Sequence, residues 1–334
     1  PPEGRSMSAE FPWLVADIGG TNARFGTVSA LGAAVEDVRV LPVAAHAGPA
    51  DAVRAYLAAR PSGLAAPRSA AFALATALDG DRIELTNAAW SFSRAATQQE
   101  LGLQTLLCLN DFEAQALSLP RLRADQLRHW GASAAAPGEV AVGTVMAVIG
   151  PGTGLGVGGV VRAPGRWIAL PGEGGHATLA PADDFESAVL GQARREFAHV
   201  SAERLLSGIG LPVLCRAVAA VMGESPEPLS TEQIVMRGLA DGSPVCARTL
   251  DLFCAMLGGF AGNVALTLGS RGGVFIGGGI VPRLGERFFA SEFRSRFEAK
   301  GRFQSFLAGI PTALITDTLA ALAGAAQALE QVDA

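Results

Sequence analysis

Two glycine-rich turns contain the residue types that bind phosphate groups. Residues 17–22 read Asp-Ile-Gly-Gly-Thr-Asn, and residues 150–154 read Gly-Pro-Gly-Thr-Gly. Glycines let backbone N–H groups approach a phosphate because no Cβ stands in the way. The carboxylate of Asp17 would repel that anion unless a cation such as Mg²⁺ lay between them. Ordinary hairpins use such turns too, so the first turn by itself leaves both interpretations open.

Two common nucleotide-binding motifs are excluded by the residues around these turns. A Walker A loop needs Gly-Lys-Ser/Thr, but the one lysine of the chain, Lys300, is followed by Gly301. A dinucleotide fingerprint lies between a strand and a helix. Here both turns lead into strand-like segments, residues 24–28 and 155–161. The context therefore favours two strand–turn–strand units over a dehydrogenase.

The elements around the two turns are similar. Apolar runs at residues 13–17 and 145–149 precede the turns, and apolar strand-like residues follow them. Two such units far apart in one chain predict a duplicated architecture. The pattern also predicts a helix from Asn110-Asp111 to residue 119, ended by Pro120, because Asn and Asp favour helix starts.

The other expected elements alternate between strands and helices, which is typical of an α/β protein. Buried strands are expected at residues 70–74, 105–109 and 273–276, and helices at residues 51–59, 183–198, 212–222 and 244–269.

Length and composition exclude several classes of protein. The chain has 334 residues, 49% hydrophobic and 17% charged, which predicts two domains and excludes a disordered chain. The net charge of −5 argues against nucleic acid as the main partner, because phosphate contacts favour a basic surface. No uninterrupted apolar stretch reaches the roughly 18–20 residues of a spanning helix, so no membrane partner is expected. The richest stretch, residues 319–329, is interpreted as a packed helix.

The cysteines and the N-terminus point to a reducing compartment. Four cysteines lie far apart without a CxxC pair: Cys108, Cys215, Cys246 and Cys254. A disulfide scaffold or a zinc site of clustered thiolates is therefore not expected, and the cytoplasm is the default location. Residues 1–6 precede Met7 and lack an apolar core, so residues 1–10 are interpreted as a leader outside the fold and not as a signal peptide.

Seven short segments follow one another along the chain: residues 15–24, 86–90, 109–112, 150–156, 170–176, 201–208 and 277–283. Together and in this order, they resemble the motifs of the bacterial ATP-dependent glucokinases, members of the hexokinase/actin-like ATPase superfamily. The resemblance runs from about residue 13 to residue 329. In it, residues 15–24 are similar to phosphate loop one, residues 150–156 to phosphate loop two and residues 277–283 to the adenosine-side motif.

One absence narrows the resemblance. The related ROK sugar kinases and repressors carry a cysteine-rich zinc motif soon after their Glu-x-Gly-His element. Here the next cysteine after His176 is Cys215, and no DNA-binding extension precedes Phe11 in this sequence. The chain is thus similar to the zinc-free glucokinase group.

The resemblance implies a fold and a reaction. The expected fold is α/β, a two-domain actin-like ATPase (ribonuclease H-like) fold in which nucleotide and sugar meet in an interdomain cleft. The smaller domain would span residues 11–120 and about 315–334, and the larger one residues 121–314. The expected activity is transfer of the γ-phosphoryl group of ATP to the 6-hydroxyl of D-glucose, giving glucose 6-phosphate and ADP. A homodimer, free of nucleic acid, is also implied.

The resemblance also assigns roles to residues. Asp111 would be the catalytic base, a role that suits a carboxylate at a helix N-terminus, whose dipole favours negative charge. The substrate-binding residues would be Asn110, Asp111, Glu173, His176, Glu203 and Asn87. The ATP-binding residues would be Asp17, Gly19, Gly20, Thr21, Asn22, Gly152, Thr153, Gly154, Gly277, Gly278 and Gly279. Mg²⁺ would arrive with ATP and be oriented by Asp17 through water, without a dedicated protein cage.

Blander interpretations stand beside these assignments. Asn110-Asp111 could simply cap a helix, Glu203 could pair with the adjacent Arg204, and Thr86-Asn87 could be a turn. The whole chain could also be a sugar sensor without catalysis, or a kinase for mannose or an N-acetylated amino sugar. Polyphosphate in place of ATP stays open as well.

Overall fold

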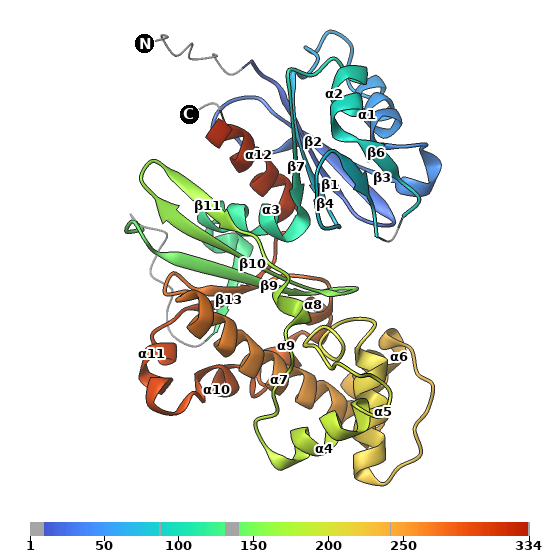
Figure 1. Ribbon diagram of the computed structural model, residues 1–334, viewed down its shortest axis with the longest axis vertical. Coiled ribbons are helices and arrows are strands. Elements are labelled where there is room, and N and C mark those ends of the chain that lie inside the picture. The colour runs from blue at the N-terminus through green and yellow to red at the C-terminus, as the bar shows by residue number, and fades with distance from the viewer. Residues whose placement is uncertain (1–9, 87, 131–139, 241, 333–334) are drawn as a thin grey trace. The chain divides into compact units, whose positions relative to one another are not determined.

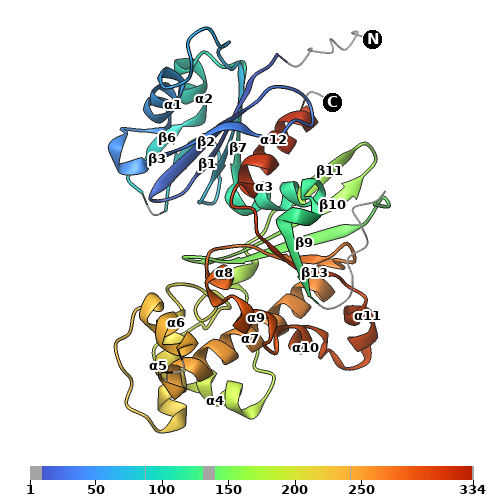
Figure 2. The same cartoon turned by 180° about the vertical axis from the view of Figure 1, so that it is seen from behind.

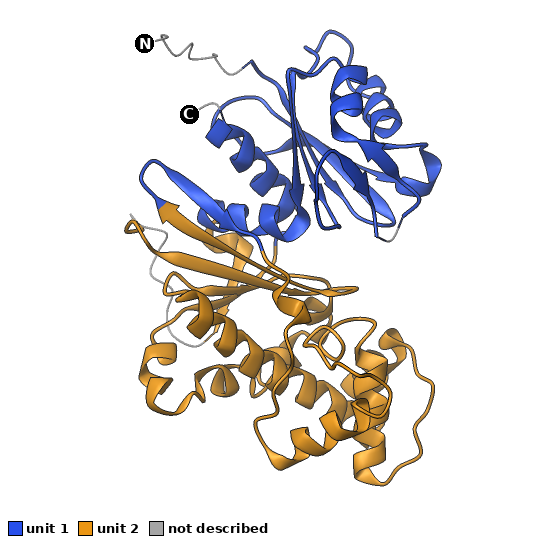
Figure 3. Cartoon of the chain, in the orientation of Figure 1, with its two compact units in different colours: residues 1–122, 163–171, 317–334 blue, residues 123–162, 172–316 orange. Residues whose placement is uncertain are grey.

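The computed structural model describes residues 10–86, 88–130, 140–240 and 242–332. The chain forms two compact units (Figure 3). Unit 1 contains residues 1–122, 163–171 and 317–334, and unit 2 contains residues 123–162 and 172–316. The sequence expectation, by comparison, placed the borders at residues 120/121 and 314/315 and kept the larger domain continuous.

Unit 1 is built on a five-stranded sheet whose order is β3-β2-β1-β4-β7. The strands are β1 (Trp13–Ile18), β2 (Asn22–Val28), β3 (Glu36–Pro42), β4 (Ser69–Leu74) and β7 (Thr105–Asn110). Strands β1, β2 and β3 are joined antiparallel, whereas β4 and β7 run parallel to β1. A small hairpin of β5 (Arg82–Glu84) and β6 (Ser91–Ser93) lies outside this sheet.

Helices cover both faces of the unit 1 sheet (Figures 1 and 2). Helices α1 (Pro49–Ala58) and α2 (Arg94–Glu100) lie on one face, and α3 (Asp111–Ser118) and α12 (Ala320–Val332) on the other. Alternate residues of β1 point to opposite faces, so Leu14 and Ala16 join the first core cluster and Trp13 and Val15 the second. The second face therefore depends on the last helix of the chain.

Helices α3 and α12 pack closely enough that one position needs glycine. A Cβ on Gly324 would lie 1.6 Å from the carbonyl oxygen of Ala114 in α3. This contact fixes α3 against α12. Because α3 begins at Asp111, the contact helps to position the predicted base.

Unit 2 repeats the strand order of unit 1 and thereby confirms the predicted duplication. Its sheet has the order β11-β10-β9-β12-β13-β8, in which β9 and β10 form an antiparallel hairpin and β12 and β13 run parallel to β9. The edge strand β11 falls within residues 163–171, which are counted with unit 1. The strands are β8 (Leu127–Trp130), β9 (Val145–Pro151), β10 (Leu155–Ala163), β11 (Arg166–Leu170), β12 (Val274–Ile276) and β13 (Thr312–Ile315). β8 is added antiparallel to β13 at the far edge.

Helix α7 (Pro244–Leu268) is the central helix of unit 2 and packs beneath the sheet (Figure 1). It is long and apolar enough to cross a membrane, but 78% of its most apolar window is buried inside the protein. It is thus a core helix. The sequence analysis was therefore wrong to name residues 319–329 as the richest apolar stretch. Helix α7 is longer and also apolar, but its few charged residues interrupt the apolar run.

Other helices of unit 2 surround α7. They are α4 (Asp184–Ala193), α5 (Leu211–Met222), α6 (Thr231–Leu239), α8 (Ile280–Leu284), α9 (Glu286–Phe289), α10 (Phe293–Glu298) and α11 (Gln304–Ala308). Helix α6 was not predicted, although Ser230 and Gln233 form the capping box that marks its start. The helix expected at residues 183–198 ends at Ala193. The turn after it places Phe197 under the guanidinium of Arg204, 4.4 Å from the ring centroid.

Candidate active site

The first glycine turn, which we call loop one (residues 18–22), joins β1 to β2 in unit 1. The N–H of Gly19 donates to the carbonyl of Asn22 over 3.0 Å, which closes the turn. The carbonyl of Thr21 accepts from the N–H of Val43 over 2.9 Å, while the side chains of Thr21 and Asn22 are exposed. Loop one is thus held by its backbone, and its polar side chains face outward.

Asp17 precedes loop one and is paired across the hairpin. Nη1 of Arg24 lies 2.9 Å from Oδ2 of Asp17, whose side chain is only 17% exposed. Burial raises the pKa of the Asp17 carboxyl, and the Arg24 charge opposes that rise without cancelling it. The carboxylate beside loop one is therefore a partly neutralised, half-buried group.

Asn110 caps helix α3, and Asp111 is the first residue of that helix. The side-chain oxygen of Asn110 accepts from the N–H groups of Phe112 (2.9 Å) and Glu113 (3.4 Å), and its Nδ2 donates to the carbonyl of Thr76 (3.1 Å). One oxygen of Asp111 accepts from the Phe112 N–H over 3.0 Å. The cap interpretation therefore applies to Asn110. Asp111 adds a half-buried carboxylate where the helix dipole favours negative charge.

The register of the sheet brings loop one and Asp111 to the same edge. Ile18 is the partner of Leu74, and Leu74 is the partner of Asn110, so the carboxyl ends of three parallel strands are level. Only β4 separates the β1 end from the β7 end. Ligands of open α/β sheets bind at such edges.

The second glycine turn, loop two (residues 150–155), joins β9 to β10 in unit 2. Its Gly152 N–H donates to the Gly154 carbonyl over 2.9 Å. The carbonyls of Gly152 and Thr153 accept from the N–H groups of Gly208 (2.7 Å) and Ile209 (3.2 Å). Loop two is thus held by hydrogen bonds from Gly208 and Ile209, which belong to a segment distant in the sequence.

Residues 277–279 pack against the start of loop two. The Gly277 N–H donates to the carbonyl of Ile149 over 2.8 Å. Gly278 has φ +75°, and a Cβ there would lie 2.4 Å from the carbonyl oxygen of Pro151. Only glycine satisfies both the left-handed backbone and the close approach. The structure therefore brings together the two segments of this unit that the sequence analysis predicted to bind ATP.

Glu173, His176 and Glu203 are brought together in unit 2. The turn η4 (Gly174–His176) follows Glu173, and its Gly175 carbonyl accepts from the Glu203 N–H over 2.8 Å. Nε2 of His176 lies 3.9 Å from Oε1 of Glu203. The His176 and Glu173 side chains are exposed, whereas that of Glu203 is 23% exposed. These three residues offer two carboxylates and an imidazole, which suit the hydroxyls of a sugar.

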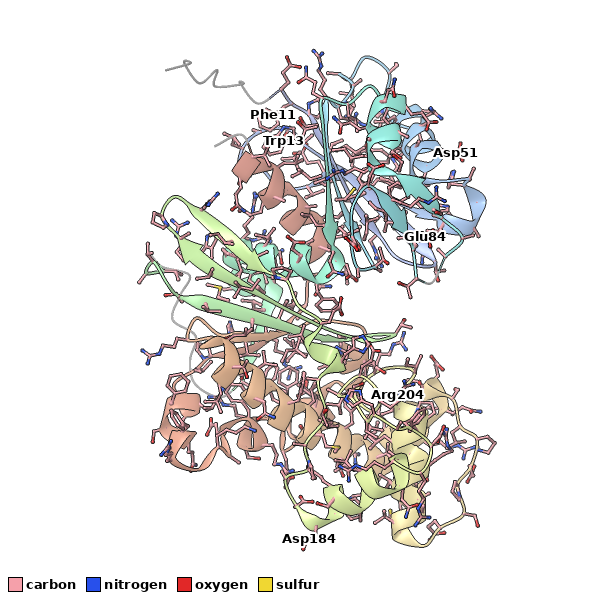
Figure 4. All side chains as sticks on the ribbon, viewed as in Figure 1. Phe11, Trp13, Asp51, Glu84, Asp184 and Arg204 are labelled. Atoms are coloured by element: carbon pink, nitrogen blue, oxygen red, sulfur yellow. The ribbon has the colours of Figure 1, made fainter. Side chains whose placement is uncertain are left out.

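The alternative role of Glu203 as the partner of Arg204 is not what the geometry shows. Arg204, labelled in Figure 4, lies over Phe197. Oε2 of Glu203 accepts from the backbone N–H of Leu155 over 2.9 Å. Asn87, the remaining predicted sugar residue, lies outside the described residues.

Two residues behind the site were missed by the sequence analysis. Ser207 is fully buried, and its hydroxyl donates to the Glu203 carbonyl (2.6 Å) and accepts from the Gly210 N–H (3.0 Å). The hydroxyl of Thr231 donates to the Gly208 carbonyl over 2.5 Å. Both hold the segment that contacts loop two. Ser207 was within a quoted motif, but nothing local in the sequence indicated which carbonyl it would meet.

The described residues do not gather three metal-ligating side chains in one place, and their thiols are buried or half-buried. No group of three or more His, Cys, Asp or Glu side chains there could hold a metal ion. The four cysteines are free thiols. Burial raises the pKa of Cys108 to about 12 and that of Cys254 to about 12, which suppresses the thiolate form that nucleophiles need.

Comparisons with known proteins identify the family of this chain. A family model described as Glucokinase matches residues 14–332. A glucokinase of Neisseria meningitidis serogroup C is 48% identical over 325 residues, which cover 97% of each chain. The crystal structure of a glucokinase from an Antarctic psychrotroph has a TM-score of 0.88 and 36% identity, covering 96% of this chain and 100% of that one.

A more distant structure shares the fold alone. A ROK-family glucokinase from Streptomyces griseus, solved with glucose and AMPPNP, has a TM-score of 0.62 and 20% identity, covering 96% of this chain and 100% of that one. The two-unit α/β architecture is thus that of the actin-like ATPase fold. Given the match over residues 14–332 and the 48% identity along nearly the whole chain, this protein belongs to the glucokinase family.

Proposed function

We propose that this chain phosphorylates D-glucose at the 6-hydroxyl, with ATP as the donor, to give glucose 6-phosphate and ADP. The observation that carries the proposal is the placement of Asp111 at the strand edge that also holds loop one, in a chain of the glucokinase family. The residues proposed for the reaction are found in both sequence units. Unit 1 contributes Asp111 and loop one, and unit 2 contributes loop two and the Glu173–His176–Glu203 group.

Each residue group has a distinct chemical task in this proposal. Phosphoryl transfer depends mainly on positioning and on neutralising charge on the phosphate oxygens, which the backbone N–H groups of the two loops serve. Asp111 accepts the proton of the 6-hydroxyl as that oxygen attacks the γ-phosphorus. Glu173, His176, Glu203 and Asn110 orient the sugar by accepting and donating hydrogen bonds to its hydroxyls.

The residues near loop one fit a magnesium ion that arrives with the nucleotide. Asp17 offers one half-buried carboxylate, already shared with Arg24, and Thr21 offers a hydroxyl. This set is too small for an all-protein cage but sufficient to orient a hydrated ion by outer-sphere contacts. When bound, Mg²⁺ supplies positive charge that offsets the charge of the phosphates.

A coupled assay tests the proposal directly. The purified chain is mixed with ATP, Mg²⁺ and D-glucose, and glucose 6-phosphate is followed through its NADP⁺-dependent oxidation by an added dehydrogenase. Product should form only when the sugar, ATP and Mg²⁺ are all present. Absence of product in the complete mixture would reject the proposal and leave a sugar-sensing role.

Substrate choice and donor choice need separate measurements. Comparing kcat/KM for glucose, mannose and N-acetylated amino sugars identifies the preferred acceptor, and glucose should lead by at least about tenfold. Replacing ATP by polyphosphate tests the donor. A higher kcat/KM for another hexose would change the substrate but keep the kinase activity.

The cellular context is part of the same proposal. The product would enter glycolysis, and the four free thiols suit a reducing cytoplasm. We also propose a homodimer and two domains divided near residues 120 and 315. Sedimentation velocity measures the first, and limited proteolysis followed by mass spectrometry of the fragments tests the second.

A further inference from the structure

Leu155, at the end of loop two, lies between the nucleotide side and the sugar side of unit 2. Its N–H donates to Oε2 of Glu203 over 2.9 Å. Its carbonyl oxygen packs against the backbone of Gly175, where a Cβ would lie only 1.9 Å away. The side chain of Leu155 is 3% exposed, so the residue is anchored in the core. The N–H of Leu155 therefore contacts Glu203 and its carbonyl contacts Gly175, two residues of the proposed sugar side of unit 2.

The backbone beyond Glu203 makes a second connection to loop two. The Glu203 N–H donates to the Gly175 carbonyl, and the N–H groups of Gly208 and Ile209 donate to the carbonyls of Gly152 and Thr153. One short segment, residues 203–209, is thus hydrogen-bonded to the turn that presents His176 and to loop two. The buried hydroxyl of Ser207 links the two ends of this segment, because it donates to the Glu203 carbonyl and accepts from the Gly210 N–H.

Gly154 shows how closely the Glu203 carboxylate is fitted to loop two. A Cβ on Gly154 would lie 2.5 Å from Oε2 of Glu203 and 3.3 Å from its Cδ. A Cβ on Gly152, two residues earlier in the same loop, would meet nothing within 4 Å. The fold therefore leaves room for a side chain at Gly152 but not at Gly154, although both glycines belong to one predicted phosphate-binding motif.

We propose that Glu203 is a positioning residue for the phosphate loop as well as a sugar ligand, so that the glucose and ATP sites are energetically coupled through it. This inference rests on the proposed function. Oε2 holds the Leu155 N–H while Oε1, beside His176, faces the sugar. A sugar that fixes the carboxylate also fixes loop two, and by thermodynamic reciprocity a bound nucleotide raises the affinity for glucose by the same factor.

The first test compares two glycine-to-alanine variants by isothermal titration with glucose in the absence of nucleotide. Gly154→Ala should raise the Kd for glucose at least about tenfold, because the new methyl group displaces the Glu203 carboxylate. Gly191→Ala in α4, a control outside the proposed site whose Cβ would also meet nothing within 4 Å, should bind glucose within about twofold of the wild type. Wild-type affinity in Gly154→Ala would overturn the inference. Failure of the wild type itself to bind glucose would instead count against the proposed function.

The second test separates the two oxygens of Glu203. Glu203→Gln keeps an acceptor for the Leu155 N–H, whereas Glu203→Ala removes it. Both should lose glucose affinity, but only Glu203→Ala should weaken binding of Mg²⁺–AMPPNP measured without sugar, by about fivefold or more. Equal nucleotide affinities in the two variants would reduce Glu203 to a sugar contact and overturn the inference. Circular dichroism and thermal melting establish that each variant is folded.

The third test measures the coupling itself. In the wild type, saturating glucose should lower the Kd for Mg²⁺–AMPPNP by about fivefold or more, and that factor should fall towards one in Gly154→Ala at equal sugar saturation. An unchanged factor in Gly154→Ala would show that the coupling does not pass through Glu203.

Discussion

The hairpins β1–β2 and β9–β10 have the same topology and carry equivalent turns, yet they are held in different ways. Loop one is closed by its own Gly19–Asn22 backbone hydrogen bond, receives one more from Val43, and is flanked by the ion pair between Asp17 and Arg24; its own polar side chains are exposed. Loop two is fixed by backbone contacts with residues 203–209 and 277–279. The two hairpins therefore carry similar glycine turns that are held by different contacts.

The difference arises from what each unit adds after the repeated strands. In unit 1, the fifth strand leads directly into α3, which puts Asn110 and Asp111 at the sheet edge. In the second sheet, β11 is followed by residues 172–210, which contain the sugar-side residues and the segment that holds loop two. The repeated strands carry the two glycine turns, whereas the segments that follow them carry the proposed catalytic and sugar-binding side chains.

The largest expected effect comes from Asp111. Asp111→Asn should lower kcat by about 10²–10⁴-fold while leaving folding and glucose binding intact, because it removes the proton acceptor and little else. The coupled assay measures kcat, and titration with glucose measures binding.

Asp184 of unit 2 is the matched control for Asp111. Each is the first residue of a helix and follows a residue whose side chain caps that helix, and Asp184 is exposed (labelled in Figure 4). Asp184→Asn should leave kcat unchanged. Similar losses in both variants would point to helix stability and would remove Asp111 from its role as base.

The next largest effect concerns the packing that holds α3. Gly324→Ala should destabilise unit 1 by about 1–3 kcal/mol or more, because its methyl group would overlap the Ala114 carbonyl. Gly191→Ala in α4, whose Cβ meets nothing within 4 Å, should instead stabilise its helix by about 0.4–1 kcal/mol. Urea unfolding followed by circular dichroism measures both, and an unaltered midpoint in Gly324→Ala would contradict the tight α3–α12 contact.

Gly278 tests whether loop two depends on its backbone neighbours. Gly278→Ala should raise the KM for ATP about tenfold, because alanine is strained at φ +75° and its Cβ would overlap the Pro151 carbonyl. Gly279→Ala, whose Cβ meets nothing within 4 Å, should produce the smaller increase. If the two variants have equal KM values for ATP, residues 277–279 do not support loop two in the way we describe.

The smallest expected effect distinguishes loop one from loop two by pH. Burial raises the pKa of Asp17, so the folded state prefers its neutral form. Stability from this group is present below its ordinary pKa of 3.8 and is lost as pH rises from that value through the raised folded pKa. Asp17→Asn removes this loss, so the Tm difference between the variant and the wild type should shift in favour of the variant as pH rises through that window. A Tm difference that is constant with pH would show that Asp17 does not titrate differently on folding.

Local sequence was a good guide to the strands next to the glycine turns and a poor guide to the elements between them. Apolar runs bounded by glycine predicted β1 and β9 because a buried strand leaves a short, local pattern. By contrast, the outer strand β3 is only partly buried and has no such pattern, and it was not predicted. The end of α4 was also misplaced, since it depends on where Phe197 packs.

The sequence by itself determined the two glycine turns, the family motifs and the residue types of the site, because these depend on identity and short-range spacing. Only the tertiary structure decided that Asn110, and not Asp111, caps helix α3, and that Asp111 lies at the same end of the sheet as loop one. It also decided that Glu203 holds the N–H of Leu155 and that Gly154 makes room for that carboxylate. Glu203 and Leu155 lie 48 residues apart in the chain, and no local pattern encodes a hydrogen bond that exists only once the chain between them has folded.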